Sequence, residues 1–252
     1  MEIIMFAIYK KEMRSYFVNA IGYVFAGIFL LFSSLICCYT TLLSQSYDAS
    51  TYFTIMIVAF VVLIPLLTMR LFAEERKMRT EQLLLTAPVT LTGMVMGKFL
   101  AAFTMFAGCL AVSCINLIPL YVIAGIERGN LSYSTTHIGP VTAEIVGCLI
   151  GLLLIGAAFI AIGTLISSLT ENQLAAAVVT MAVIIGLIGI GLFSSLVDVY
   201  WIRMTFSWIS ILGRFGNFSA GVFDISAVIY FVSLIFTFLF LTVRVYEKRR
   251  WN

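Results

Sequence analysis

Residues 70–98 read RLFAEERKMRTEQLLLTAPVTLTGMVMGK and form the only long charged interruption between long apolar runs. Six charged residues lie between positions 74 and 81, and a leucine run at 83–85 and Pro88 follow them. The flanking runs are long enough to cross a hydrocarbon core, whereas a charged stretch of this kind is stable only outside one. The stretch therefore predicts a membrane protein with a connector held outside the bilayer.

The composition also indicates a membrane protein. Hydrophobic residues make up 62% of the chain, charged residues only 11%, and the mean hydropathy is +1.10. These values exclude an ordinary soluble globular domain. The net charge is only +3 and no basic face carries interleaved aromatic residues, so no nucleic-acid partner is expected.

Apolar runs of roughly 20 residues or more recur along the chain, which is the length needed to cross a core of about 30 Å. No run alternates polar and apolar residues, and this favours helices over a β-barrel. The sequence therefore predicts an all-α integral membrane protein with one transmembrane domain over residues 1–252. Its six spans are expected at about 18–43, 53–73, 93–124, 142–168, 174–196 and 225–245.

The distribution of basic residues predicts the orientation of this bundle. With both termini in the cytoplasm, only Arg128, Arg203 and Arg214 of the 15 lysines and arginines fall outside. An odd number of spans would place the basic amino-terminal segment and the basic EKRR end on opposite faces. We therefore expect a multi-pass protein of the cell membrane, embedded in the lipid bilayer, with cytoplasmic termini.

Two other segments predict helices that do not span. Residues 4–16 carry Lys10, Lys11 and Glu12 and are interpreted as an interfacial helix, with an extension of the first span as the alternative. Residues 197–224 are aromatic and amphipathic but interrupted by glycine and charge. Short re-entrant or interfacial helices before the last span explain them, and an ordinary aromatic belt is the alternative.

Small residues recur every four positions at Ala143, Gly147 and Gly151. They would line one face of the fourth span, where a neighbouring backbone can approach closely. The sequence leaves open whether this neighbour belongs to the same chain or to a second copy.

No catalytic, cofactor-binding or metal site is predicted. The five cysteines fall within predicted spans, where they suit apolar packing better than disulfides or metal binding. The single histidine, His137, has no cluster of cysteine or carboxylate ligands near it in the sequence. No Asp, Glu or Lys lies near the middle of a span, which disfavours an ion-coupled carrier.

Two partial motifs in the charged stretch are rejected. The pattern EExxxR at 74–79 matches the first motif of CAAX-type intramembrane proteases, but their mechanism also needs histidines, and His137 is expected on the opposite face. The pattern GxxxGK at 93–98 has three residues between its glycines where a phosphate loop has four, and neither Ser nor Thr follows Lys98. Neither protease activity nor ATP binding is therefore expected.

The connector is predicted to contain a short helix. Residues 80–87 can form about two helical turns, because Glu81 suits a helix amino terminus and Pro88 disfavours helical geometry at Ala87. The leucines at 83–85 cannot all face one way, so leucine is exposed either to a protein groove or to lipid headgroups. Flanking charges of both signs suit the rim of a protein contact. A solvated connector is the alternative.

The run FAEERKxRTEQLLLTAPV at 72–89, followed by GKFLA at 97–101, resembles the segment between spans two and three of type-2 ABC exporter permeases. The similarity extends across the six predicted spans. The aromatic stretch 206–224 and the EKRR end most resemble the gliding-motility branch of that family.

This resemblance implies a non-enzymatic membrane subunit of an ATP-driven exporter. Its implied partners are separate cytoplasmic ATPase subunits and a second permease, either a copy of this chain or a homologue. ATP and magnesium would bind in those ATPases, and this chain would bind no cofactor. The branch also implies an auxiliary membrane protein with an exposed domain. The alternative is a structural or mechanosignalling component that an ATPase moves without transporting a substrate.

The family's coupling helix and its second ATPase contact map onto two segments of this sequence. The residues implied in the coupling helix are Arg76, Arg79, Thr80, Glu81, Leu83, Leu84, Leu85 and Pro88. The residues implied in the second contact are Thr170, Glu171, Asn172 and Gln173, for which a plain hairpin turn is the alternative.

Overall fold

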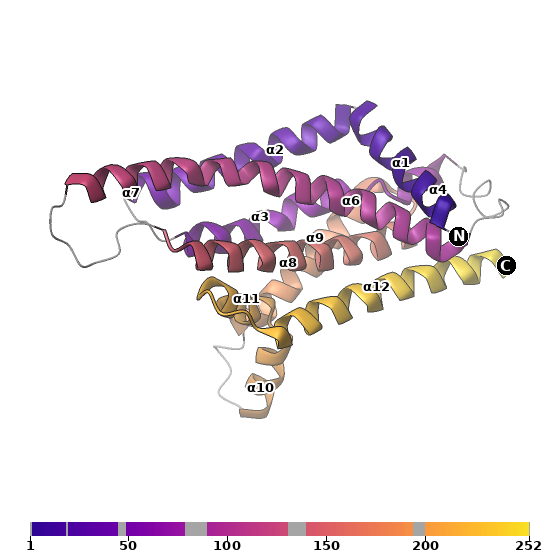
Figure 1. Ribbon diagram of the computed structural model, residues 1–252. Coiled ribbons are helices and arrows are strands. Elements are labelled where there is room, and N and C mark those ends of the chain that lie inside the picture. The colour runs from indigo at the N-terminus through magenta and orange to yellow at the C-terminus, as the bar shows by residue number, and fades with distance from the viewer. Residues whose placement is uncertain are drawn as a thin grey trace.

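The computed structural model describes residues 2–18, 20–44, 49–78, 90–130, 140–193 and 200–251. This described part is 91% helical and contains no strand (Figure 1). Its α-helices are α1 (Glu2–Val18), α2 (Ala20–Cys37), α3 (Ser50–Thr68), α4 (Ala73–Lys77), α6 (Leu91–Ser113), α7 (Ile118–Asn130), α8 (Thr142–Leu169), α9 (Gln173–Phe193), α10 (Tyr200–Ile209), α11 (Ile211–Ser219) and α12 (Ile225–Trp251). A π-helical segment, η1 (Cys38–Leu43), extends α2, and a 3₁₀ segment, η2 (Cys114–Leu117), joins α6 to α7.

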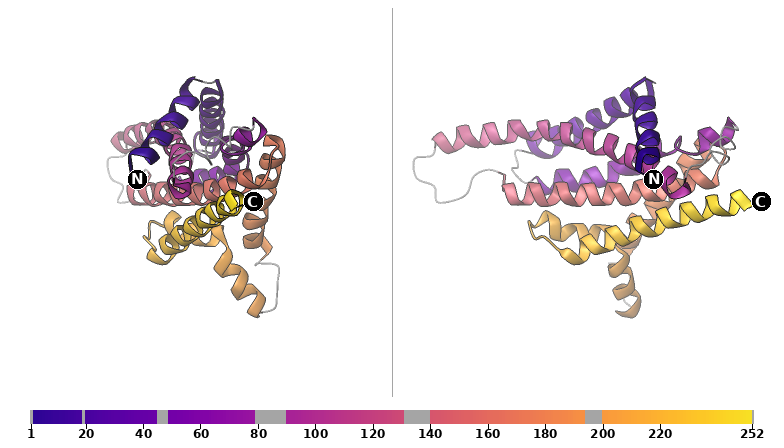
Figure 2. Two further views of the ribbon diagram at one scale, coloured as in Figure 1. Left: turned by 90° about the vertical axis from the view of Figure 1, so that its right-hand side faces the viewer. Right: turned by 45° about the vertical axis from the view of Figure 1, so that its right-hand side comes forward.

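The prediction of six membrane-spanning helices is confirmed. Among the described residues, six helical stretches are long and apolar enough to cross a bilayer: Ala20–Thr41, Ser50–Lys77, Leu91–Gly125, Thr142–Leu169, Gln173–Gly191 and Ile225–Arg250. Figure 1 shows both ends of the chain, together with α4, at one end of the bundle, which we call the terminal end. In Figure 2, α1 runs across this end rather than along the spans.

Helix α8 forms the centre of the bundle. In its most apolar part 67% of the residues are buried, compared with 22% in α9, and α3, α6, α9, α11 and α12 all pack against it. Beside it, the rings of Phe29, Phe60 and Phe106 from three helices pack at centroid distances of 5.1–6.2 Å. Contacts with these five helices therefore hold α8 in place, and the segments that are bonded to its end have a defined position.

Two spans depart from regular α-helical geometry far from the terminal end. In η1 the hydroxyls of Thr40 and Thr41 donate to carbonyls one turn earlier, which competes with the backbone pattern. The 3₁₀ segment η2 precedes Pro119, which has no N–H and whose ring excludes the regular position of an earlier carbonyl. Asn116 Nδ2 donates to Ser33 Oγ at 2.9 Å, so a polar contact joins η2 to α2, the helix that η1 extends.

Two short helices, α10 and α11, precede the last span. The Arg214 guanidinium lies 4.3 Å from the ring centroid of Tyr230 on α12 and donates to the Trp208 carbonyl at 3.1 Å. Trp201 and Trp208 are exposed. The expected short helices are therefore present, while their depth in a membrane stays a prediction.

Candidate functional site

The site begins at the turn between α3 and α4, which leads into the charged connector. The Ser167 hydroxyl near the end of α8 accepts hydrogen bonds from the backbone N–H groups of Phe72 and Ala73, at 3.1 and 3.2 Å. It also donates to the Met69 carbonyl at 3.3 Å. One buried hydroxyl thus satisfies three backbone groups of an irregular turn and fastens this turn to the central helix.

The end of α12 closes the same turn from another side. The rings of Phe72 and Tyr246 pack with centroids 5.1 Å apart, and both residues are buried. Arg249 lies over the Tyr246 ring at 5.4 Å and donates to the Ser168 carbonyl at 2.6 Å. The basic last turn of α12 is therefore a structural part of the site.

Arg76 joins the two segments that the sequence assigns to a partner contact. Its Nη1 donates to the Leu169 carbonyl at 3.0 Å, and its Nη2 lies 2.9 Å from Glu171 Oε1. Arg76, Lys77, Glu171 and Asn172 line an open groove of about 420 Å³. The start of the predicted coupling helix and the loop after α8 thus form one surface, although 95 positions separate Arg76 from Glu171 in the sequence.

The loop after α8 is a short, ordered connection between two spans. Thr170 donates its hydroxyl to the Ile166 carbonyl at 3.1 Å, and Asn172 Oδ1 accepts from the Leu174 N–H at 3.0 Å. Gln173 is the first residue of α9. Glu171 is left with a side chain that is 71% exposed, so it is available to a partner.

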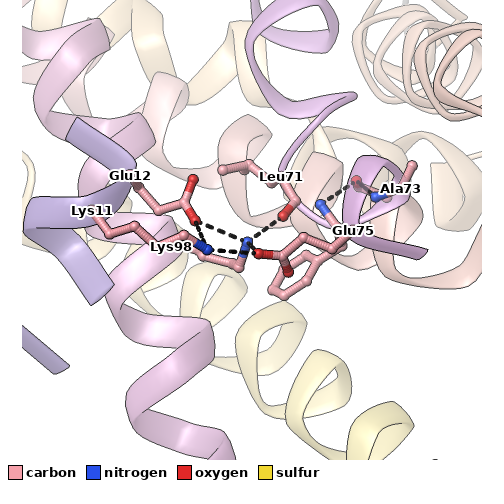
Figure 3. A network of polar contacts seen from close by, with 8 residues as sticks. Lys11, Glu12, Leu71, Ala73, Glu75 and Lys98 are labelled. Carbon is pink, nitrogen blue, oxygen red and sulfur yellow. Dashed lines mark hydrogen bonds and ion pairs between the residues drawn. The ribbon is translucent and has the colours of Figure 1, made fainter. Parts of the chain in front are cut away.

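Lys98 on α6 is buried in a network of ion pairs at the terminal end (Figure 3). Its Nζ lies 3.2 Å from Glu12 Oε1 on α1 and 2.9 Å from Glu75 Oε1 on α4, and it donates to the Leu71 carbonyl at 2.6 Å. Lys11 Nζ lies 3.3 Å from the same Glu75 oxygen. The Lys98 side chain is 2% exposed, so its charge is compensated by these partners rather than by water.

A small cavity of about 40 Å³ lies beside this network, between α1 and the α3–α4 turn. Glu12, Tyr16, Arg70 and Glu74 contribute to its lining, and Arg70 pairs with Glu74. Burial raises the pKa of the Tyr16 hydroxyl, the Glu12 carboxylate acts in the same direction, and Arg70 opposes them. The volume is enough for a few water molecules.

Several residues of the predicted coupling helix lie outside the described residues. They are Arg79, Thr80, Glu81, Leu83, Leu84, Leu85 and Pro88, and His137 also lies outside. Their predicted roles stay predictions. Within the described ranges, no three His, Cys, Asp or Glu residues lie close enough together to hold a metal ion.

Sequence reasoning missed Ser167, Lys98 and Glu12, which hold the α3–α4 turn, α4 and α1 beside the groove without lining it. A usable signal was present for Lys98, because a lysine inside an apolar helix needs a buried carboxylate or carbonyl partner. The pattern GxxxGK that contains it has a structural role: a Cβ at Gly97 would lie 3.0 Å from the Met5 carbonyl oxygen. The glycine therefore allows α1 to approach α6 closely.

The stripe of small residues on α8 faces α11 of the same chain. A Cβ at Gly147 would lie 2.6 Å from the Phe218 carbonyl oxygen, and one at Gly151 would lie 3.0 Å from the Phe215 ring. Ala143 lies near Gly221, whose φ is +71°. The sequence left open whether the neighbour of this stripe belongs to the same chain or to a second copy. In the structure, α11 of the same chain occupies this part of the helix face.

A bundle of six membrane-spanning helices, with the polar helix α4 fastened to one end, defines a multi-pass membrane component. The particular family follows from the sequence, because residues 10–189 match the family described as ABC-2 family transporter protein. The chain belongs to that family, whose members are permease components rather than the ATPases that work with them. A comparison with curated proteins finds no match.

Proposed function

We propose that this chain is the membrane subunit of an ATP-driven exporter and that the groove beside Arg76 is part of its ATPase contact. The observation that carries the proposal is the joining of Arg76 to Leu169 and Glu171. This contact places the beginning of the charged connector and the loop 170–173 on one surface, as a single docking partner requires.

The chemistry of this surface suits a protein partner. The groove presents Arg76, Lys77, Glu171 and Asn172, and charges of both signs at a rim set register and partner choice more than affinity. In the proposal, the leucines at 83–85, which follow this rim in the sequence, supply the apolar part of the contact. In the proposal, the terminal end, which carries this groove, faces the cytoplasm because most of the basic residues lie there.

The proposed mechanism needs no chemistry in this chain. ATP and magnesium bind in two ATPase subunits, and closure of these subunits moves the connectors of two paired permeases. Each bundle then changes which side of its pathway is open, as a two-state element biased by a ligand bound elsewhere. The second permease is a copy or a homologue. The aromatic 206–224 stretch and the EKRR end favour the gliding-motility branch and its auxiliary partner with an exposed domain.

The docking contact is tested by co-purifying the ATPase with the full-length chain. We expect Arg76→Glu and Leu84→Asp each to reduce the captured ATPase by about tenfold or more, as loss of a contact worth at least 1.4 kcal/mol requires. Arg203→Gln is the matched control, because Arg203 is exposed on α10 and lies outside the proposed contact. Undiminished capture and undiminished stimulated hydrolysis with both variants would overturn the proposal.

A further inference from the structure

Helix α1 is attached to its neighbours by two different kinds of contact. Toward α6 it packs tightly, since a Cβ at Gly97 would lie 3.0 Å from Met5 O and 3.2 Å from Ile8 Cγ2. Toward the α3–α4 turn it is separated by the cavity of about 40 Å³ that Glu12, Tyr16 and Arg70 help to line. On that side, ion pairs bridge α1 and α4.

Lys98 is the centre of this bridge. An ammonium group has three N–H donors and no acceptor, and Lys98 Nζ has three oxygen partners: Glu12 Oε1 at 3.2 Å, Glu75 Oε1 at 2.9 Å and Leu71 O at 2.6 Å (Figure 3). These partners belong to α1, α4 and the turn before α4. A single side chain on α6 therefore joins three elements.

The two carboxylates lie close together around the buried Lys98 ammonium. Glu12 and Glu75 are only 14% and 16% exposed, and each has an oxygen within 3.2 Å of the same Nζ. Like charges this close repel when no cation lies between them. Lys11 Nζ also lies 3.3 Å from Glu75 Oε1 and 3.8 Å from Glu12 Oε1, but its side chain is 63% exposed, so water weakens both contacts.

We propose that Lys98 is a positioning residue that fastens α1 to α4, so that α1 follows α4 whenever the connector is displaced. The second half of this inference rests on the proposed function, because residues 79–89 come directly after α4 in the chain and the proposed ATPase acts on them. In this arrangement the amino-terminal helix and the start of α6 move with the connector as one body.

The fastening is tested in the full-length chain without any partner. Spin labels at Arg14 on α1 and Met78 after α4, with Cys38→Ser to remove the exposed native thiol, report the distance between the two elements. We expect one narrow distance distribution when Lys98 is present. With Lys98→Met or Glu12→Gln, the distribution broadens toward longer distances. Lys10→Met, an exposed change on α1, serves as the matched control and leaves it narrow.

A narrow distribution that survives both Lys98→Met and Glu12→Gln overturns the fastening role. If Lys98→Met does not fold, Glu12→Gln decides, because it leaves Lys98 paired with Glu75 and Leu71. A role in stability alone would lower the melting temperature of these variants without moving the labels apart, so the distance separates the two roles.

Transmission is tested in the complex of the unlabelled chain with its ATPase. We expect Lys98→Met to leave ATPase capture intact but to lower stimulated hydrolysis by about fivefold or more, the lower range of coupling between sites. If Lys98→Met captures the ATPase and stimulates its hydrolysis as strongly as the unchanged chain does, the proposed role of α1 in transmission is overturned. If the unchanged chain captures no ATPase, the proposed function is overturned, and so is the proposal that α1 moves with the connector. The distances between the spin labels still test whether Lys98 fastens α1 to α4.

Discussion

Ser167 shows how a single residue can define a functional turn. Its hydroxyl contacts three backbone groups of the segment from Met69 to Ala73, which links the end of α3 to the first residue of α4. Buried backbone N–H groups without a partner are costly, so this turn keeps its shape only while the hydroxyl is present. The position of α4 therefore depends on a side chain 94 residues further along the chain.

Replacing Ser167 should destabilise the protein. In Ser167→Ala the N–H groups of Phe72 and Ala73 lose their acceptor, and each buried unsatisfied group costs about 1–3 kcal/mol. Thermal unfolding in detergent is the measurement. Ser168→Ala is the matched control, because Ser168 is equally buried but its hydroxyl donates only within α8, to the Leu165 carbonyl at 2.6 Å. Equal melting temperatures for the two variants would contradict this account.

Asp224, before α12, should make stability depend on pH. A hydrogen bond from the Asn217 side chain, followed by one from the Ser226 N–H, holds the pKa of the Asp224 carboxyl below its ordinary value. A carboxyl with a lowered folded-state pKa stabilises the fold above its unfolded pKa, near 3.9, and loses this effect as the pH falls through the folded value.

Melting curves of the unchanged chain and of Asp224→Asn test this dependence. Above about pH 4 the unchanged chain should melt at the higher temperature, and the difference should shrink as the pH is lowered further. A difference that stays constant or grows toward acid pH would exclude the ionised carboxylate as its source.

At the scale of helices, the sequence predicts which helices form better than it predicts which residues of different helices contact one another. The length and apolar character of the runs are local properties, and they were sufficient to identify six spans. The contacts Lys98–Glu12 and Arg76–Glu171 join residues 86 and 95 positions apart. No periodicity encodes such pairs, because they arise only when the spans pack. The stripe at Gly147 and Gly151 was visible in the sequence, but its neighbour α11 was not.

The contact between α8 and α11 predicts opposite outcomes for two glycines. Gly147→Ala places a Cβ 2.6 Å from the Phe218 carbonyl oxygen, and relieving an overpacked backbone contact costs about 1–3 kcal/mol. At Gly186 on α9 a Cβ meets nothing within 4 Å, so Gly186→Ala should stabilise by up to about 1 kcal/mol through helix propensity. Unfolding of both variants in detergent is the measurement. A loss of stability in Gly186→Ala as large as that in Gly147→Ala would contradict the close approach of α8 to α11.

For the whole molecule, the position of the termini constrains the topology. Both ends of the chain lie at the terminal end of the bundle (Figures 1 and 2), as an even number of spans requires. The side of the membrane that this end faces is predicted from the charge distribution. Lys10, Lys11, Lys248 and Arg249 all belong to it, and basic residues flanking short spans stay in the cytoplasm. We therefore expect the terminal end in the cytoplasm and the loop before α12 outside.

Accessibility of single cysteines in intact cells measures this orientation. A membrane-impermeant thiol reagent should label a cysteine at Val222, which is 59% exposed before α12, without permeabilisation. Cysteines at Lys10 and Lys248 should react only after the membrane is opened, because α1 and the last turn of α12 share the terminal end. The unchanged chain, whose free thiols include the exposed Cys38, gives the background. Labelling of Lys10 and Lys248 alone would invert the orientation, and equal labelling of all three positions in intact cells would contradict the six-span arrangement itself.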